Sequence, residues 1–266
     1  MMSKGVPPSS DEMRAETTVF DALLRQLKQN KPFPRYAAER RIDIFINIFL
    51  EAILSHGGNK VVFVAPEFPL WDDRRGKGFF QLDYLCAFES TNQPVFVELK
   101  TDASYFQPDR AKDYVRKARS WKSCIEELKT ITSGERHTSH EDKYLHLVKS
   151  LHQTGLIDLS SDALQILRQA SDSVSEHSFR REDTSRISEA LRDISRGMGV
   201  HHDRAAKLIY IAPDDDDIKS KLDSLRKDND LEIELLDFTY IEATSTDVET
   251  PFPGELRRLA LFLKNL

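Results

Sequence analysis

The chain has 266 residues, of which 39% are hydrophobic and 31% are charged, and its formal net charge is −6. This length allows one large domain with an elaboration, and the composition is that of a globular protein. The negative charge argues against a protein that coats nucleic acid over its whole surface, although it allows a local basic groove. The longest apolar stretch, 42–54, is too short and too polar to span a bilayer, and residues 1–10 lack the features of a secretory signal. We therefore expect no membrane partner and a cytoplasmic location.

The first part of the chain alternates helical and strand-like patterns. Apolar residues at helical spacing predict a helix from about Thr17 to Asn30, and a second helix from about Arg35 to His56 follows the proline pair at 32 and 34. The period then changes. Three short apolar runs predict the strands of a meander, at 61–65, 79–88 and 94–99.

The rest of the chain is helical before the strand pattern returns. Helices are predicted near 109–132, 140–154, 161–175 and 183–197, strands at 207–211 and 231–241 with a helix between them, and a closing helix at 254–266. This order predicts an α/β protein with a mixed sheet flanked by helices and a core that is split in sequence. Residues 1–108 would form the N-terminal helices and the first part of the core, 109–206 a helical insertion, and 207–266 the remainder of the core.

Two ionisable residues interrupt the end of the third predicted strand. Glu98 and Lys100 are two residues apart, so in a strand they project from the same face, while Leu99 projects from the other. Burying a carboxylate and an ammonium there costs several kcal/mol per ion unless each has a partner. A metal ion and a substrate phosphate would supply such partners.

Asp83 interrupts the neighbouring strand in the same way. Antiparallel pairing across the hairpin at 89–93 would bring it close to Glu98. The two carboxylates and the backbone carbonyl of Leu99 are hard oxygen ligands, which Mg²⁺ or Mn²⁺ prefers. Lys100 could then hold or deprotonate an attacking water and offset charge at phosphorus.

The spacing of an Asp, fourteen residues and then Glu-x-Lys at the end of a strand resembles the PD-(D/E)XK nuclease superfamily. The resemblance covers about 35–102, with weaker support from 207–243. It implies a restriction endonuclease-like fold and metal-dependent hydrolysis of phosphodiester bonds in nucleic acid, DNA rather than RNA. Leu82 precedes Asp83 where the family motif has proline. A second copy of the chain, in a homodimer, is a further candidate partner.

The same resemblance suggests two more acidic residues for the metal. Glu67 follows the first predicted strand, and Glu39 lies on the second helix, where Glu51 competes for the same role. The alternatives are a solvated strand end for Glu67 and an exposed helix surface for the other two.

Candidate contacts to nucleic acid flank the motif. Arg74, Arg75 and Lys77 lie in a basic loop between predicted strands, and Gln107 and Arg110 begin the helix after the motif. A polar hairpin and a solvated helix face are the alternatives. The two cysteines lack a CxxC spacing, and the histidines lack the spacing of a zinc site, so neither group predicts metal chemistry of its own.

These patterns predict a Mg²⁺-dependent nuclease in which Asp83, Glu98 and Lys100 are catalytic. The alternative is a catalytically silent protein of the same fold that binds nucleic acid or a protein partner.

Overall fold

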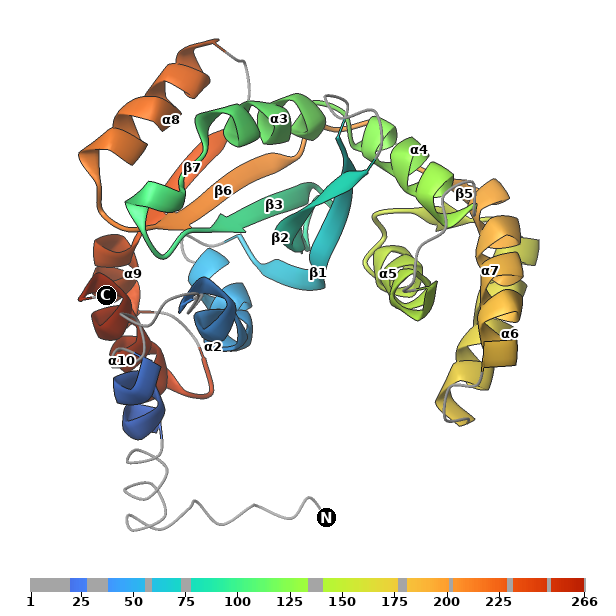
Figure 1. The fold of residues 1–266 in the computed structure, drawn as a ribbon, viewed down its shortest axis with the longest axis horizontal. Coiled ribbons are helices and arrows are strands. Elements are labelled where there is room, and N and C mark those ends of the chain that lie inside the picture. Colours follow the sequence, from blue (N-terminus) through green and yellow to red (C-terminus); the bar gives the residue numbers. More distant parts are fainter. Residues whose placement is uncertain are drawn as a thin grey trace.

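The computed structural model describes residues 20–27, 38–55, 59–72, 78–133, 141–176, 181–200, 203–228, 232–247 and 250–265. Within these ranges the protein is α/β, as predicted, with a mixed sheet flanked by helices (Figure 1). None of the described helices combines the length and apolar character that crossing a bilayer requires.

The sheet has five strands in the order β1-β2-β3-β6-β7. β1 (Val61–Trp71), β2 (Phe79–Phe88) and β3 (Pro94–Leu99) form the predicted antiparallel meander. β6 (Lys207–Ala212) and β7 (Ile233–Asp237) then extend the sheet in parallel to β3. The two parts of the sheet therefore meet at β3 and β6, which are far apart in sequence.

Helices cover both faces of the sheet (Figure 1). On one face lie α2 (Ala38–Leu54), α9 (Phe238–Thr244) and α10 (Pro253–Lys264), and on the other α3 (Pro108–Ala118) and α8 (Asp216–Asp228). A separate hydrophobic core lies on each face of the sheet, and alternate residues of β3 point into each. Val95 and Val97 pack on the α2 side, and Phe96 packs on the α3 side. All six residues of β3 are buried, as expected for the central strand of a sheet covered on both faces.

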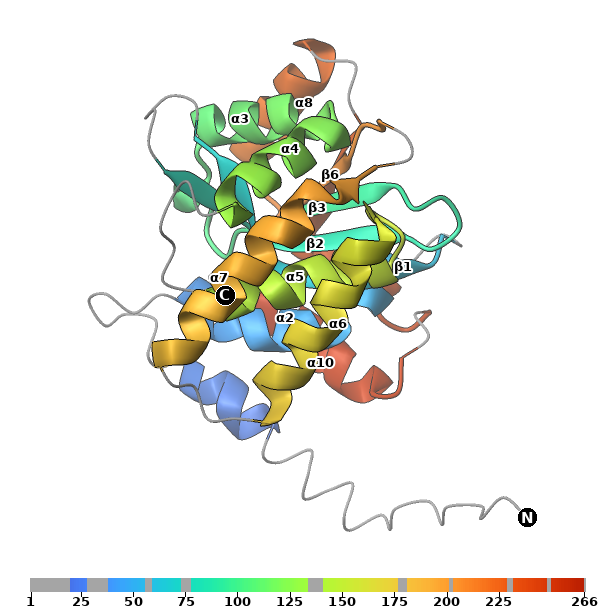
Figure 2. The same cartoon turned by 90° about the vertical axis from the view of Figure 1, so that its right-hand side faces the viewer.

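The crossover from β3 to β6 contains the predicted helical block. It comprises α3, α4 (Trp121–Thr132), α5 (Glu141–Gln153), α6 (Ser161–Glu176) and α7 (Arg181–Arg196), with a small two-stranded sheet of β4 (Asp158–Leu159) and β5 (Met198–Gly199). Figures 1 and 2 show α4 to α7 beyond the β1 side of the sheet. The block shares one buried cluster with the α3 side of the sheet, joined at Trp121, whose ring lies 5.5 Å from that of Phe68. Its description as a separate insertion stays a prediction.

Three predicted boundaries were wrong. The strand predicted at 61–65 continues to Trp71, so Glu67 lies within β1 and not after it. The helix predicted at 109–132 is two helices, because Ser120 has an extended backbone and its Oγ accepts a hydrogen bond from Ser123 N, which begins α4. The strand predicted at 231–241 ends at Asp237, whose carboxylate accepts from Tyr240 N and begins α9. At Ser120 and at Asp237 a capping side chain outweighed the apolar pattern.

Candidate active site

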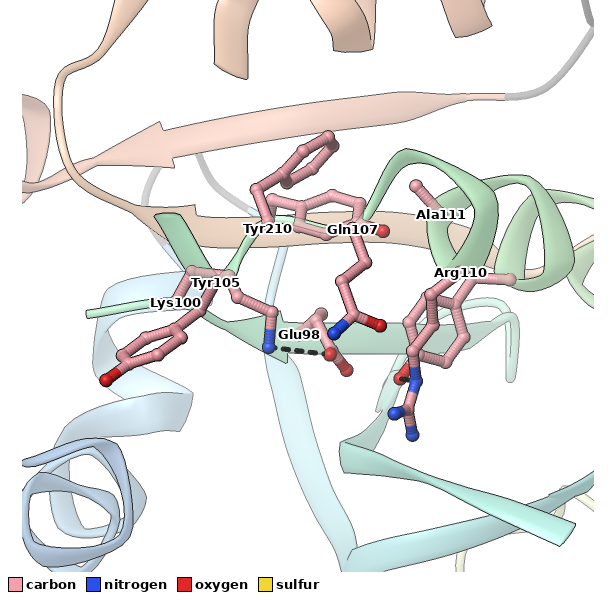
Figure 3. Close-up of a pocket in the computed structure, with 9 residues that line it drawn as sticks. Glu98, Lys100, Tyr105, Gln107, Arg110, Ala111 and Tyr210 are labelled. Atoms are coloured by element: carbon pink, nitrogen blue, oxygen red, sulfur yellow. Dashed lines mark hydrogen bonds and ion pairs between the residues drawn. The ribbon is translucent and has the colours of Figure 1, made fainter. Parts of the chain in front are cut away.

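Glu98 and Lys100 form a buried ion pair at the end of β3. Lys100 Nζ lies 2.8 Å from Glu98 Oε1, and it also donates to the Leu99 carbonyl oxygen at 2.9 Å. The side chains are 12% exposed for Lys100 and 5% for Glu98. Both line the same pocket (Figure 3), on the face expected from the pleat of a strand. An ion pair this far from water loses much of its hydration, so its position needs a reason beyond simple pairing.

Two oxygen atoms in the pocket lack hydrogen bonds within the described part of the chain. These are Glu98 Oε2 and the Tyr210 hydroxyl, and both are buried. Glu98 and Tyr210 are register partners on the parallel strands β3 and β6. A buried polar atom without a partner costs roughly 1–3 kcal/mol, so these oxygens favour a ligand or water in the pocket.

The pocket is small, and both charged and aromatic side chains line it. It encloses about 60 Å³, which is room for a few water molecules or a hydrated ion but not for a nucleotide base. α3 supplies one wall through Arg110, Ala111 and Tyr114, and the segment before α3 supplies Tyr105, Phe106 and Gln107. The lining side chains carry two cations, Lys100 and Arg110, against one carboxylate.

Arg110 is held on the wall by its neighbours. Its Nε donates to the Tyr114 hydroxyl at 3.2 Å, Nη2 donates to the Gln81 carbonyl at 3.4 Å, and the guanidinium lies 5.4 Å from the centre of the Phe80 ring. Burial alone would lower the pKa of Arg110, but Tyr114 and then the Glu98 and Asp83 carboxylates raise it, and the net change is upward. Arg110 therefore keeps its positive charge beside the pocket.

The two tyrosines remain neutral. Burial raises the pKa of Tyr114 and of Tyr210 above the usual range, and the Glu98 carboxylate raises both further. Each hydroxyl therefore keeps its proton. The Tyr114 proton is donated to the Gln81 carbonyl at 3.2 Å.

Asp83 lies beside the pocket rather than in its lining. The pairing between β2 and β3 ends at Tyr84 and Val97, although β2 continues to Phe79, and beyond that pair the Asp83 side chain bonds to β3 in place of the β2 backbone. Its Oδ2 accepts the Leu99 N–H at 2.7 Å. The Glu98 and Asp83 carboxylates both raise the pKa of Arg110 and of Tyr210, so both act electrostatically on the same two groups. The hairpin thus brings Asp83 next to β3, where its carboxylate also holds the end of that strand by bonding to Leu99 N–H.

The additional acidic candidates lie elsewhere or outside the described side chains. Glu67 has a left-handed backbone (φ 51°), is exposed, and pairs with Lys143 of α5 instead of lining the pocket. Glu51 Oε1 accepts the Phe63 N–H of β1 at 2.7 Å. The side chain of Glu39 is outside the described residues. Glu67 lies within β1, between residues that pair with Tyr84 and Leu82 of β2, and its positive φ is a backbone feature that a pattern of alternating residues cannot anticipate.

Of the five residues predicted to contact nucleic acid, two line the pocket and three lie outside the described residues. Gln107 and Arg110 line the pocket (Figure 3). Arg74, Arg75 and Lys77 lie outside the described residues. Tyr114 and Tyr210 also line the pocket, and the sequence reasoning missed both. The only signal for Tyr210 was a hydroxyl within the apolar run of β6, and nothing in the sequence aligned it with Glu98.

The oxygen atoms suit a cation that keeps most of its water. Glu98 Oε2 is a buried carboxylate oxygen that accepts no hydrogen bond within the described residues, whereas Asp83 Oδ2 accepts the Leu99 N–H and the Leu99 carbonyl accepts from Lys100. In the described ranges, no group of three or more His, Cys, Asp or Glu residues could hold a metal ion. Mg²⁺ often binds through one or two carboxylates and several waters, so Asp83, Glu98 and the Leu99 carbonyl are candidate ligands of the kind that this ion takes.

Comparisons with protein-family models, curated proteins and solved structures found no match for this chain.

Proposed function

We propose that the protein is a metal-dependent nuclease that hydrolyses phosphodiester bonds in nucleic acid, with DNA expected before RNA. The observation that carries the proposal is the buried Glu98–Lys100 pair at the end of β3, which lines a pocket that also contains Arg110 and an unpaired carboxylate oxygen. Asp83 beside it completes the arrangement that resembles PD-(D/E)XK nucleases, and the mixed sheet is compatible with a restriction endonuclease-like fold. The cytoplasmic location and a homodimer stay predictions.

Mg²⁺ or Mn²⁺ would be held by Asp83, Glu98 and the Leu99 carbonyl. When bound, the ion would polarise the phosphate and lower the pKa of a water molecule. Lys100 Nζ now contacts two of the same oxygens, Glu98 Oε1 and the Leu99 carbonyl. Its ammonium would therefore exchange those contacts for contacts to the attacking water and to a phosphate oxygen.

The remaining side chains would bind and orient the substrate. Arg110 supplies a fixed charge for a nonbridging phosphate oxygen, and the Gln107 amide is a donor at the entrance of the pocket. In the reaction, water adds to phosphorus, one ester P–O bond breaks, and the products are a phosphate monoester and a free hydroxyl group. Stabilising the extra negative charge at phosphorus is the main task of these cations.

A catalytically silent scaffold that binds nucleic acid or a protein partner is the second candidate. Two observations favour it: Lys100 already neutralises Glu98, and no cluster of three acidic, cysteine or histidine ligands occurs in the described ranges. The unpaired Glu98 Oε2 favours the nuclease.

One experiment tests the proposal. Plasmid and single-stranded DNA are incubated with the protein in Mg²⁺, Mn²⁺ or EDTA, beside the variants Asp83→Asn, Glu98→Gln and Lys100→Met. We expect cleavage that requires metal and falls by at least about a hundredfold in each variant, because each removes charge from the site. The matched control is Glu89→Gln, since Glu89 is an exposed carboxylate paired with Lys60 at 2.8 Å.

Full activity in the Glu98 and Lys100 variants would overturn the assignment of the site. A wild-type protein that binds DNA but never cleaves it would support the silent scaffold.

A further inference from the structure

Tyr105 is an exposed aromatic residue at the rim of the pocket. It ends the short 3-10 helix η1 (Ala103–Tyr105), which joins β3 to α3, and 53% of its surface is exposed. The next residue, Phe106, is buried and packs against Tyr210 with 5.5 Å between ring centres. An exposed tyrosine is ordinary on a protein surface. This one, however, lines the same pocket as Glu98 and Lys100.

The backbone holds Tyr105 firmly in this position. Asp102 Oδ1 accepts hydrogen bonds from Ser104 N at 2.9 Å and from Ser104 Oγ at 2.7 Å, and Tyr105 N donates to the Asp102 carbonyl at 3.1 Å. The Tyr105 hydroxyl, by contrast, makes no hydrogen bond with the residues that the structure describes. The ring is therefore presented to solvent from a fixed backbone, which lowers the entropy cost of binding a flat ligand.

Tyr105 and Arg110 project on opposite sides of the Glu98–Lys100 pair (Figure 3). A phosphate at the pair would lie between an aromatic face and a guanidinium. The pocket, at about 60 Å³, is too small for a base, so a base attached to that phosphate must remain at the rim. Tyr105 is the aromatic ring exposed there.

We propose that Tyr105 stacks on an unpaired base next to the phosphate at Glu98 and Lys100, so that the preferred ligand is single-stranded nucleic acid or an unpaired end. The inference rests on the proposed function, because it takes the phosphate position from it. Bases inside a duplex are stacked on both faces and cannot offer one to a tyrosine. An unpaired base can, and such stacking does not depend on sequence.

Binding in the absence of cleavage tests this inference. A short single-stranded DNA that carries a fluorescent adenine analogue, and the same sequence as a blunt duplex, are titrated with full-length protein in EDTA and in Ca²⁺. We expect tighter binding to the single strand and quenching of the analogue by stacking. Tyr105→Ala should weaken binding of the single strand by roughly 5- to 100-fold, and Tyr105→Trp should retain it.

Phe252→Ala is the matched control. Phe252 is 51% exposed at the start of α10 and does not line the pocket, so its removal should leave binding and quenching unchanged. Thermal unfolding of each variant verifies that it is folded.

Single-strand binding and quenching that are unchanged in Tyr105→Ala would overturn the inference, as would equal affinity for the duplex. If the wild type cleaves DNA while Tyr105→Ala binds normally, this inference fails and the nuclease stands. Stacking that depends on Tyr105 in a protein that never cleaves supports the inference and overturns the nuclease. Failure to bind either DNA overturns both.

Discussion

At the scale of single residues, Lys100 occupies the position beside Glu98 where the proposed metal ion would bind. Its ammonium contacts Glu98 Oε1 and the Leu99 carbonyl, two of the oxygens that would hold a metal ion. A buried carboxylate needs a cation, and in this structure the cation comes from the protein itself. Metal binding would therefore compete with an internal ion pair.

This competition predicts the behaviour of Lys100→Met. Without metal, the variant should lose about 3–5 kcal/mol of unfolding free energy, because it leaves Glu98 buried without its partner. Mn²⁺ should restore more stability to the variant than to the wild type, since the ammonium no longer competes. Urea unfolding with and without Mn²⁺ measures both effects.

Lys60→Met is the control for this prediction, because Lys60 pairs with Glu89 at the surface. It should lose little stability and respond to Mn²⁺ as the wild type does. Equal stabilisation of Lys100→Met and wild type by Mn²⁺ would contradict the competition.

At the scale of the elements, capping side chains decide where the chain changes from strand to helix. Asp237 has an extended backbone, and its carboxylate accepts from Tyr240 N at 2.7 Å, so β7 ends and α9 begins at this residue. Ser120 divides α3 from α4 in the same manner. The two capping bonds begin α4, directly after the helix α3 that carries Arg110 and Tyr114 to the pocket, and α9, which covers the opposite face of the sheet.

Replacing the cap of α9 should destabilise the protein without affecting the pocket. Asp237→Ala should lower the free energy of unfolding by about 0.5–2 kcal/mol, whereas Asp237→Asn should retain most of it, since Asn also caps helices well. Urea unfolding gives the difference between the two variants. Equal losses in both would show that the capping bond contributes little.

At the scale of the whole molecule, several acidic groups are buried in their neutral form. Burial raises the pKa of the Cys86 and Cys124 thiols and of the Tyr114 and Tyr210 hydroxyls. The unfolded chain has ordinary values, about 8.5 for Cys and about 10 for Tyr. Above those pH values the unfolded state releases protons that the folded state still holds, so stability decreases as pH rises.

The contribution of these four groups to the free energy of unfolding should therefore be full below about pH 8.5 and decrease above it. Tyr210→Phe should show a smaller decrease above about pH 10, because it removes one of the raised groups while its lost hydroxyl makes no hydrogen bond within the described residues. Unfolding in urea at a series of alkaline pH values measures this. A parallel decrease in both proteins would contradict the prediction for Tyr210.

The sequence by itself determined the α/β class, the meander of β1 to β3, and the placement of Glu98 and Lys100 on one face of a buried strand. These features depend on local periodicity: residues two apart share a face of any strand, and an apolar run with no polar side indicates a covered one. Asp83 near Glu98 followed from the short hairpin between them, whose register is a local property.

Only the tertiary structure decided which residues surround that motif. Tyr210 faces Glu98 because β6 pairs with β3 in parallel after a long helical crossover, and such a register depends on packing over the whole core rather than on a nearby turn. The left-handed backbone at Glu67 directs that residue to Lys143, and the caps at Ser120 and Asp237 overrode longer apolar patterns. Local patterns specify faces of single elements, whereas a site assembled from separate elements is defined only when those elements pack.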